Sequence, residues 1–279
     1  MLPFVDSRNR RYPLIGKNET MRIRRLFLFP FLFLWVAAAA IASNDKPGPA
    51  SGPGPGKVFL YTAKKLGIPV MKASLHIGTN LSLQGRPLYE IRAEIASVNT
   101  GLFFRMNNRF TSTFEQENCS PVQYIKEVDQ AGLFREKKHY HQILTFDSER
   151  NRVLVAKVGE KEKQEISVPP GTFDPLSMFG RCYLKEDLHP NQEIRMTIYD
   201  GLKLRQMVFQ PQQKKIKSKI LGEVEAVCLE ATTTFASFED REGVIRIWYT
   251  MDGKRTPILM ELDLPVGSIT FELDEIKEG

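Results

Sequence analysis

The sequence contains few of the residues and motifs that enzyme active sites commonly use. Its 279 residues include three cysteines, four histidines and two tryptophans. It has no His-Glu-x-x-His, Gly-x-Ser-x-Gly or Cys-x-x-Cys motif. A Gly-rich segment ends at Lys57, but it lacks the spacing of a phosphate loop, because Ser51 stands where the first glycine is required. We therefore predict no catalytic residue, no cofactor and a protein that is not an enzyme.

The histidines give little support for a metal site. His139 and His141 flank Tyr140 in an expected strand, where residues two apart face the same side. A third ligand is not evident, and Lys137 and Lys138 place positive charge beside the pair, which disfavours a cation. The sequence predicts a solvated strand face here and no metal site.

The three cysteines are Cys119, Cys182 and Cys228. Their number allows at most one disulfide within the chain, and the sequence leaves the pairing open. Cys228 lies in the apolar run 224–229, where it can serve as a small apolar residue. No histidine is placed to activate any of the three, so we predict no cysteine nucleophile.

Long apolar runs are also rare, and the one at residues 26–41 follows the basic segment 22–25. The run leads into Ala42 through a small-x-small sequence, and this combination is typical of a secretory signal peptide. The alternative is a transmembrane anchor. The run is shorter than the roughly 20 residues of a span, and Pro30 interrupts it, so a cleaved signal is favoured.

These features predict the organisation of the chain. Residues 1–20 are a mis-assigned start or an extension, residues 21–42 are the signal, and cleavage occurs before Ser43, which places the protein in the periplasm. Residues 43–57 alternate proline and glycine and form a flexible linker. Residues 58–279 then form one domain, and we expect no transmembrane span in the mature chain.

Charge excludes one class of partner. The whole chain has 39 basic and 33 acidic residues, a net charge of +6. Residues 1–42 hold seven of the basic and two of the acidic residues, so 32 basic and 31 acidic residues remain in the mature chain, a net charge of +1. Because nucleic-acid binding requires a basic surface, we predict no nucleic-acid partner.

The mature chain consists largely of short segments with a period of two. Residues 245–251, 258–264 and 269–273 alternate apolar with polar residues, which predicts an antiparallel meander with one apolar face. Similar strand candidates are residues 58–61, 70–77, 87–98, 102–114, 122–128, 133–146, 152–158, 165–168, 193–199, 202–209, 215–220 and 223–233. The fold class is therefore all-β, mainly an antiparallel curved sheet, roll or half-open barrel.

One segment, near residues 175–184, predicts a short helix. Asp174 suits the N-cap, and Pro175 suits the first helical position, which needs no amide donor. Leu176, Phe179 and Tyr183 recur at helical spacing and form an apolar stripe. The helix either fills the core as a plug or covers a ligand space as a lid.

Several short motifs recur in a characteristic order along the mature chain. They are Leu66-Gly67-Ile68, Asp174-Pro175-Leu176-Ser177, Asp200-Gly201-Leu202-Lys203, Trp248-Tyr249-Thr250-Met251-Asp252 with Arg255 and Pro257, and Val266-Gly267-Ser268. In these motifs the sequence resembles, over residues 58–273, the bacterial exported proteins grouped as domain of unknown function 3108. The resemblance implies a periplasmic or envelope location and a mostly β fold. It implies no activity.

The leading functional hypothesis is binding of a lipid, another apolar or amphipathic molecule, or an envelope protein on the concave face of the sheet. Candidate lining residues are Phe103, Met106, Phe110, Met207, Phe209, Trp248 and Met260. Asp252 and Arg255 form a candidate ion pair at a turn. One alternative is a structural or assembly factor of the envelope that acts through a strand edge. Another is a hydrolase whose site is assembled from scattered residues.

Overall fold

The computed structural model describes residues 54–82, 85–98, 104–132, 135–190, 192–235, 241–265 and 267–278. The helix and the strands among these residues lie between Lys57 and Glu278. The predicted leader lies outside the described residues. The first strand starts at Lys57, which the sequence assigned to the end of the linker.

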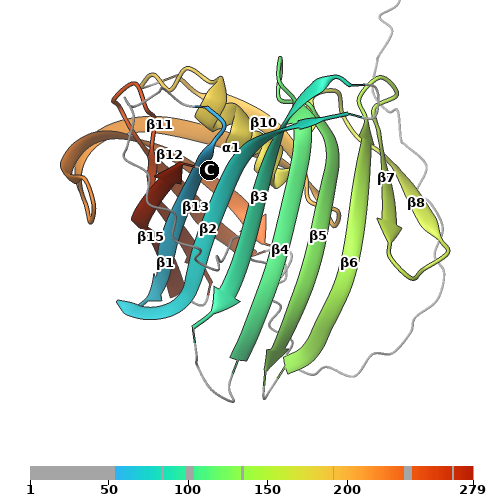
Figure 1. Ribbon diagram of the computed structural model, residues 1–279, viewed down its shortest axis with the longest axis horizontal. Helices are drawn as coiled ribbons and strands as arrows, with labels where there is room; N and C mark the ends of the chain where they lie inside the picture. Colours follow the sequence, from blue (N-terminus) through green and yellow to red (C-terminus); the bar gives the residue numbers. More distant parts are fainter. Residues whose placement is uncertain are drawn as a thin grey trace, which may run out of the picture.

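Fifteen strands form one sheet in the order β8-β7-β6-β5-β4-β3-β2-β1-β15-β14-β13-β12-β11-β10-β9 (Figure 1). The strands are β1 (Lys57–Lys65), β2 (Ile68–Leu81), β3 (Pro87–Ser97), β4 (Phe104–Glu115), β5 (Pro121–Gly132), β6 (Arg135–Asp147), β7 (Arg152–Lys157), β8 (Lys163–Ser167), β9 (Thr172–Phe173), β10 (Ile194–Tyr199), β11 (Leu204–Ser218), β12 (Gly222–Phe235), β13 (Arg241–Thr250), β14 (Pro257–Leu264) and β15 (Gly267–Glu278). This confirms the predicted all-β class.

The sheet is a meander whose two chain ends lie side by side. From β1 to β8 and from β10 to β15, each strand pairs antiparallel with the strand that follows it. The pairing of β1 with β15 joins the two halves of the sheet, and β8 and β9 lie at its opposite edges. Only β9 pairs parallel, with β10, among the described strands. The sheet curves so that its two halves face each other across the single described helix, α1 (Pro175–Leu184) (Figure 1). We call the side that carries α1 the concave face.

Alternation along each strand fills the space beneath this concave face. In β5, for example, Tyr124, Lys126 and Val128 are buried, while Ile125 and Glu127 between them are partly exposed. Aromatic rings join the helix to the sheet: the Tyr183 ring lies 5.9 Å from Phe59, and the Phe179 ring lies 6.0 Å from Tyr249, measured between centroids. The apolar face predicted from period two is therefore the core of the domain.

The helix is fixed at both ends, as a plug would be. Asp174 is the N-cap, as predicted, and a side chain from β4 also binds its carboxylate. At the other end, Arg255 Nη1 donates to the carbonyl oxygens of Cys182, at 3.2 Å, and Glu186, at 2.6 Å. Gly180 lets the helix approach the sheet, because a Cβ there would lie 2.5 Å from the Phe114 ring. No described helix has the length and apolarity required to cross a membrane.

One prediction about the strands was wrong. Residues 202–209 and 215–220 were expected as two strands, but β11 is continuous through Pro211. Its first part pairs with β10 up to Phe209, and the part from Gln210 onward pairs with β12 alone. Proline is tolerated there because the strand has become an edge, where a missing amide donor costs no ladder hydrogen bond.

Candidate functional site

The main candidate site is a group of polar side chains buried on the concave face, where strands from the two halves of the sheet meet. We call it the concave cluster. Its members are Lys126 on β5, Tyr140 and Gln142 on β6, Asp200 in the β10–β11 turn, and Arg205 on β11. Lys126, Gln142 and Asp200 are 3%, 5% and 6% exposed, so each polar atom needs a protein or ligand partner.

Lys126 faces the core because β5 alternates, and residue 126 shares the inward side with Tyr124 and Val128. Its Nζ donates to the backbone carbonyl of Asp200 at 2.8 Å and lies 5.9 Å from the centroid of the Tyr140 ring. Burial lowers the pKa of Lys126 to about 8, against the attraction of Asp200 and with the repulsion of Arg205. The ammonium group is thus held in the interior at a cost in stability.

Arg205 and Asp200 form a buried ion pair. Arg205 Nη1 lies 2.7 Å from Asp200 Oδ2, and the two side chains are 13% and 8% exposed. Arg205 Nε donates to the carbonyl of Thr234 at 2.9 Å. Its Nη2, and Oε1 of Gln142, have no hydrogen-bond partner among the described residues. A buried guanidinium with an unused donor is a ready site for an acceptor from a ligand.

The β10–β11 turn (residues 200–203) positions the cluster. Asp200 Oδ1 accepts from the backbone amides of Leu202 and Lys203, both at 2.8 Å. Gly201 has a φ of +85°, and a Cβ there would lie 2.8 Å from Gln142 Oε1. The turn at Asp200-Gly201 therefore needs glycine for two reasons, its backbone conformation and its close approach to β6.

The cluster carries more positive than negative charge. Lys126 and Arg205 are cationic, and among the described residues Asp200 supplies the carboxylate of the cluster, which pairs with Arg205, while its backbone carbonyl accepts from Lys126. Burial and Asp200 together raise the pKa of Tyr140 to about 12, so this phenol stays neutral. With Lys126 protonated, the cluster has an excess of one positive charge, and an anionic group would complement it.

A second buried carboxylate, Asp174, belongs to the helix. Its Oδ1 accepts from the amides of Leu176, at 2.7 Å, and Ser177, at 3.0 Å, and its Oδ2 accepts from Ser112 Oγ at 2.7 Å. Burial raises its pKa to about 6, against these hydrogen bonds. Because the helix N-terminus already satisfies this carboxylate, it does not neutralise the concave cluster by contact.

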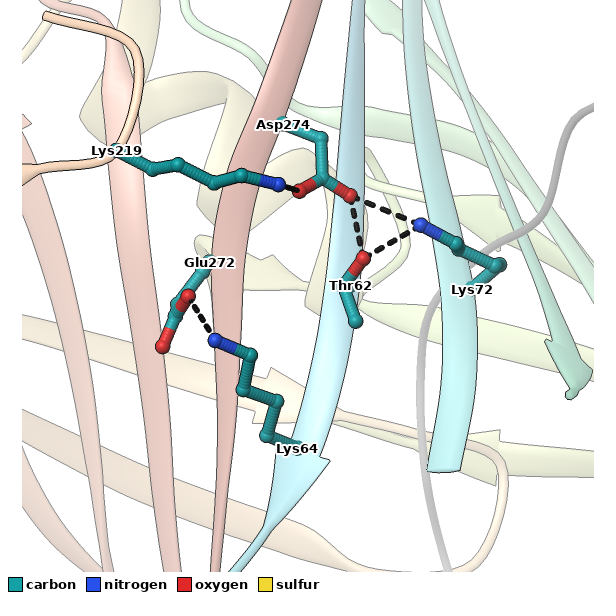
Figure 2. A network of polar contacts seen from close by, with 6 residues as sticks. All are labelled: Thr62, Lys64, Lys72, Lys219, Glu272 and Asp274. Atoms are coloured by element: carbon teal, nitrogen blue, oxygen red, sulfur yellow. Dashed lines mark hydrogen bonds and ion pairs between the residues drawn. The ribbon is translucent and has the colours of Figure 1, made fainter. Parts of the chain in front are cut away.

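A third polar group lies on the opposite face of the sheet, and we call it the outer network (Figure 2). It consists of Thr62, Lys64, Lys72, Lys219, Glu272 and Asp274. Lys72 Nζ lies 2.6 Å from Thr62 Oγ1 and 3.1 Å from Asp274 Oδ2, and Lys219 also contacts Asp274. These contacts hold the tip of the β11–β12 hairpin against β15, β1 and β2.

Comparisons with known proteins agree with this geometry. A family model described as "Protein of unknown function (DUF3108)" matches residues 58–274. The chain belongs to the DUF3108 family. A solved structure described as a β-barrel-like protein of domain of unknown function DUF1849 from Brucella abortus has a similar fold, with a TM-score of 0.51 and 10% identity. The similarity covers 81% of this chain and 98% of that chain. No curated protein matches significantly.

In this DUF3108 protein, most of the residues predicted to line a ligand site are part of the core. Met106, Phe110, Met207, Phe209 and Met260 are 0–7% exposed and pack within one cluster of buried residues. They therefore adjoin the concave face without forming an open lining. Phe103 lies outside the described residues.

Trp248 differs from the other candidate lining residues. Tyr249, its neighbour, contacts α1, so the Trp248 ring lies on the opposite side of β13 from the concave face. It was wrongly included among the concave residues. The ring is nevertheless covered, with 7% exposure, and Lys214 Nζ lies 5.8 Å from its centroid.

The predicted turn ion pair is not formed within the described part of the chain. Arg255 donates to the carbonyls at the end of α1, as described above. Asp252 instead accepts from the hydroxyl of Thr250 and from the amide of Lys254. Arg255 has a φ of +51°, and its side chain points toward the helix. Its role is to cap α1.

Sequence reasoning missed the concave cluster. Lys126 is flanked by acidic and apolar residues in a strand, and this pattern looks like an exposed position unless the alternation is followed from Tyr124 to Val128. That alternation was the available signal, because it places a lysine in the apolar register. No sequence pattern connects Lys126 with Asp200, 74 residues later.

Proposed function

We propose that this protein is an exported, non-enzymatic binding protein whose concave face takes the acidic head group of an amphipathic molecule. The observation that carries the proposal is a pair of cations in the interior: Arg205 pairs with the Asp200 carboxylate, and Lys126 binds the backbone carbonyl of Asp200. Arg205 Nη2 has no hydrogen-bond partner among the described residues. A carboxylate or phosphate is the natural acceptor for such donors.

The surroundings favour an amphipathic ligand over a small inorganic anion. Apolar core side chains adjoin the cluster, among them Leu144 of β6 and Met207 of β11. Of the five concave candidate residues that are described, three are methionines: Met106, Met207 and Met260. Methionine is flexible and can repack around an apolar tail with little strain.

The proposal includes export to the periplasm. Its support is the leader-like pattern of residues 21–42, which precedes the folded domain. N-terminal sequencing of protein from the envelope fraction tests this directly, with Ser43 as the expected first residue. A chain in that fraction that begins at Met1 or Met21 would contradict it.

The chemistry of the described side chains supports a binding role over an enzymatic one. Burial raises the pKa of the Cys119 thiol to about 11 and that of Cys228 to about 12, and it also raises the pKa of Cys182. These thiols stay protonated at neutral pH and are poor nucleophiles. Asp174 meets two serines but no histidine, so it does not assemble a hydrolase triad.

The assembly-factor alternative has one feature in its favour, the edge strand β8. It pairs with β7 and with no other described strand. Its exposed residues include Lys163 and Glu165, however, and charged residues are how natural proteins protect an edge from further pairing. Ligand binding on the concave face is therefore the better-supported function.

The test is a titration of the purified chain from Ser43 onward with a naturally fluorescent long-chain fatty acid and with the corresponding fatty alcohol. We expect the acid to bind more tightly than the alcohol. Lys126→Met removes the ammonium and keeps an apolar stem. A lost charge-assisted hydrogen bond of about 1.5–3 kcal/mol should weaken binding of the acid roughly 10- to 100-fold and leave the alcohol unchanged.

Lys217→Met is the matched control, since Lys217 is an exposed lysine on β11. Arg205→Gln should show the same selective loss as Lys126→Met, and Arg195→Gln, at an exposed arginine of β10, should not. Equal affinity for acid and alcohol in the unaltered protein would contradict the proposal. Undiminished binding of the acid by Lys126→Met would contradict it as well.

A further inference from the structure

We propose that the tips of the β1–β2 and β11–β12 hairpins form a face that docks on an anionic lipid surface. This face comprises residues 64–72 and 217–222 together with Glu272 and Asp274, and we call it the hairpin face. It lies on the outside of the sheet, opposite the concave cluster, and the proposal does not depend on the ligand proposed above.

The β1–β2 tip exposes two large apolar side chains. Leu66 is 90% exposed and Ile68 is 66% exposed, although the protein buries most of its other leucines and isoleucines. Leu66 has a φ of +51° and Gly67 a φ of +78°, so a leucine occupies a left-handed turn position where glycine or asparagine is normally preferred. Both the exposure and the strained backbone disfavour the folded state, which indicates selection for something other than stability.

The β11–β12 tip supplies a second apolar pair on the same side of the molecule. Ile220 and Leu221 are 38% and 41% exposed. The preceding residue, Lys219, reaches Asp274 on β15, and Asp274 also binds Thr62 of β1 and Lys72 of β2 (Figure 2). Thr62 precedes Leu66 by four residues, roughly 13 Å along a strand. The outer network therefore holds the two tips on one side of the molecule.

The charge around these apolar side chains is positive. Residues 64–72 and 217–222 contain five lysines and neither aspartate nor glutamate. Glu272 pairs with Lys64 at 2.5 Å, and Asp274 pairs with Lys72 and Lys219. Glu223, opposite Lys217 on β12, is a third carboxylate beside these residues. Five lysines against three carboxylates leave an excess of two positive charges. Basic residues beside exposed apolar side chains are the pattern that anionic lipid surfaces attract.

The other end of β2 shows that apolar exposure alone does not define this face. Leu81 is 67% exposed, nearly the same as Ile68. Nearby, Arg92 pairs with Glu90 at 2.9 Å and Arg86 with Glu115 at 3.6 Å, so the charges there balance. The apolar side chains also come from two separate hairpin tips, whereas each partner in a stable protein interface buries roughly 800 Å² of continuous surface. A lipid surface accommodates such tips without matching their shape.

The experiment is vesicle flotation with the chain from Ser43 onward, which keeps every described helix and strand and removes the apolar leader. Vesicles of phosphatidylcholine alone are compared with vesicles that also contain phosphatidylglycerol. We expect binding to the anionic vesicles, weakened by added salt. The double variant Leu66→Ser/Ile68→Ser should bind them at least about 10-fold more weakly, because two side chains no longer enter the apolar layer.

Leu81→Ser is the matched control and should float like the unaltered protein. Lys65→Gln/Lys217→Gln keeps the apolar tips and should bind the anionic vesicles about 10-fold more weakly, because two of the lysines that attract the anionic surface are removed. Equal flotation of the Leu66→Ser/Ile68→Ser variant and Leu81→Ser would overturn the proposal. So would absence of binding to anionic vesicles, or equal binding to both kinds of vesicle. Fatty acid binding by the tip variants should be unchanged, which separates this face from the concave cluster.

Discussion

Asp174 offers the sharpest test of how the buried polar groups affect stability, because two substitutions separate its charge from its role as a helix cap. Asp174→Asn keeps an oxygen where Oδ1 accepts from the amides of Leu176 and Ser177, and it places an amide group next to Ser112 Oγ, which can accept. Asp174→Ala removes all of these contacts. The first change therefore isolates the charge, and the difference between the two variants measures the cap together with the contact to Ser112.

The magnitude follows from the burial of the carboxylate. Burial raises the pKa of Asp174 from 3.8 to about 6. That difference corresponds to about 3 kcal/mol by which the folded protein disfavours the ionised form at neutral pH. At pH 7.5 the free energy of unfolding of Asp174→Asn should therefore be up to about 3 kcal/mol higher than that of the unaltered protein.

The pH dependence has a definite sign. Because the folded pKa is raised, the folded state holds the proton more tightly than the unfolded state does. The stability that the folded protein gains by holding this proton is fully present below pH 3.8 and is lost as the pH rises through about 6. The stability gap between Asp174→Asn and the unaltered protein should thus be near zero at pH 3.8 and largest above pH 6.

Urea denaturation across this pH range measures the gap. Asp174→Ala should be less stable than Asp174→Asn by about 1.5–5 kcal/mol, from about 0.5–2 for the lost cap and about 1–3 for the unpaired Ser112 hydroxyl. The reasoning is refuted if Asp174→Asn is less stable than the unaltered protein at pH 7.5. In that case the helix N-terminus stabilises the carboxylate by more than burial disfavours it.

Three further predictions concern other positions. Gly201→Ala should destabilise the protein by about 1 kcal/mol or more beyond Gly171→Ala, because both glycines have a positive φ but only the Gly201 Cβ would collide with a neighbour; equal melting temperatures would contradict the close approach. Lys126→Met should stabilise the protein by about 1–3 kcal/mol at pH 7. In urea titrations this difference in stability should close between pH 8 and 10.5, because the folded protein releases the lysine proton near pH 8 and then no longer holds a buried charge. A difference in stability that is independent of pH would argue against a buried ammonium. Trp248→Ala should cost about 3–5 kcal/mol in urea denaturation, as for other covered aromatic residues; a loss below 1 kcal/mol, roughly that of a surface substitution, would show that the ring is not part of the packing.

The sequence by itself determined the class of the fold and the helix that the described residues contain. Period-two alternation is a local property, so residues 245–251 already specify that Ile247 and Tyr249 share a side and that Trp248 faces the other way. The signal for the helix was equally local, since Asp174 and Pro175 are adjacent in sequence and both lie at its N-terminus. The break expected between residues 209 and 215 was wrong, because whether a strand tolerates Pro211 depends on which neighbour it has there.

Only the tertiary structure decided which polar residues meet. Alternation placed Lys126 on the inward side of β5, but its contact with Asp200 and Arg205 depends on how far the sheet curves and on where the β10–β11 turn enters the concave side. The hairpin face likewise requires Lys219 to reach Asp274, 55 residues further along the chain. Strand periodicity fixes the direction of each side chain relative to its own strand. It carries no information on the curvature of the sheet, and curvature brings distant strands into contact.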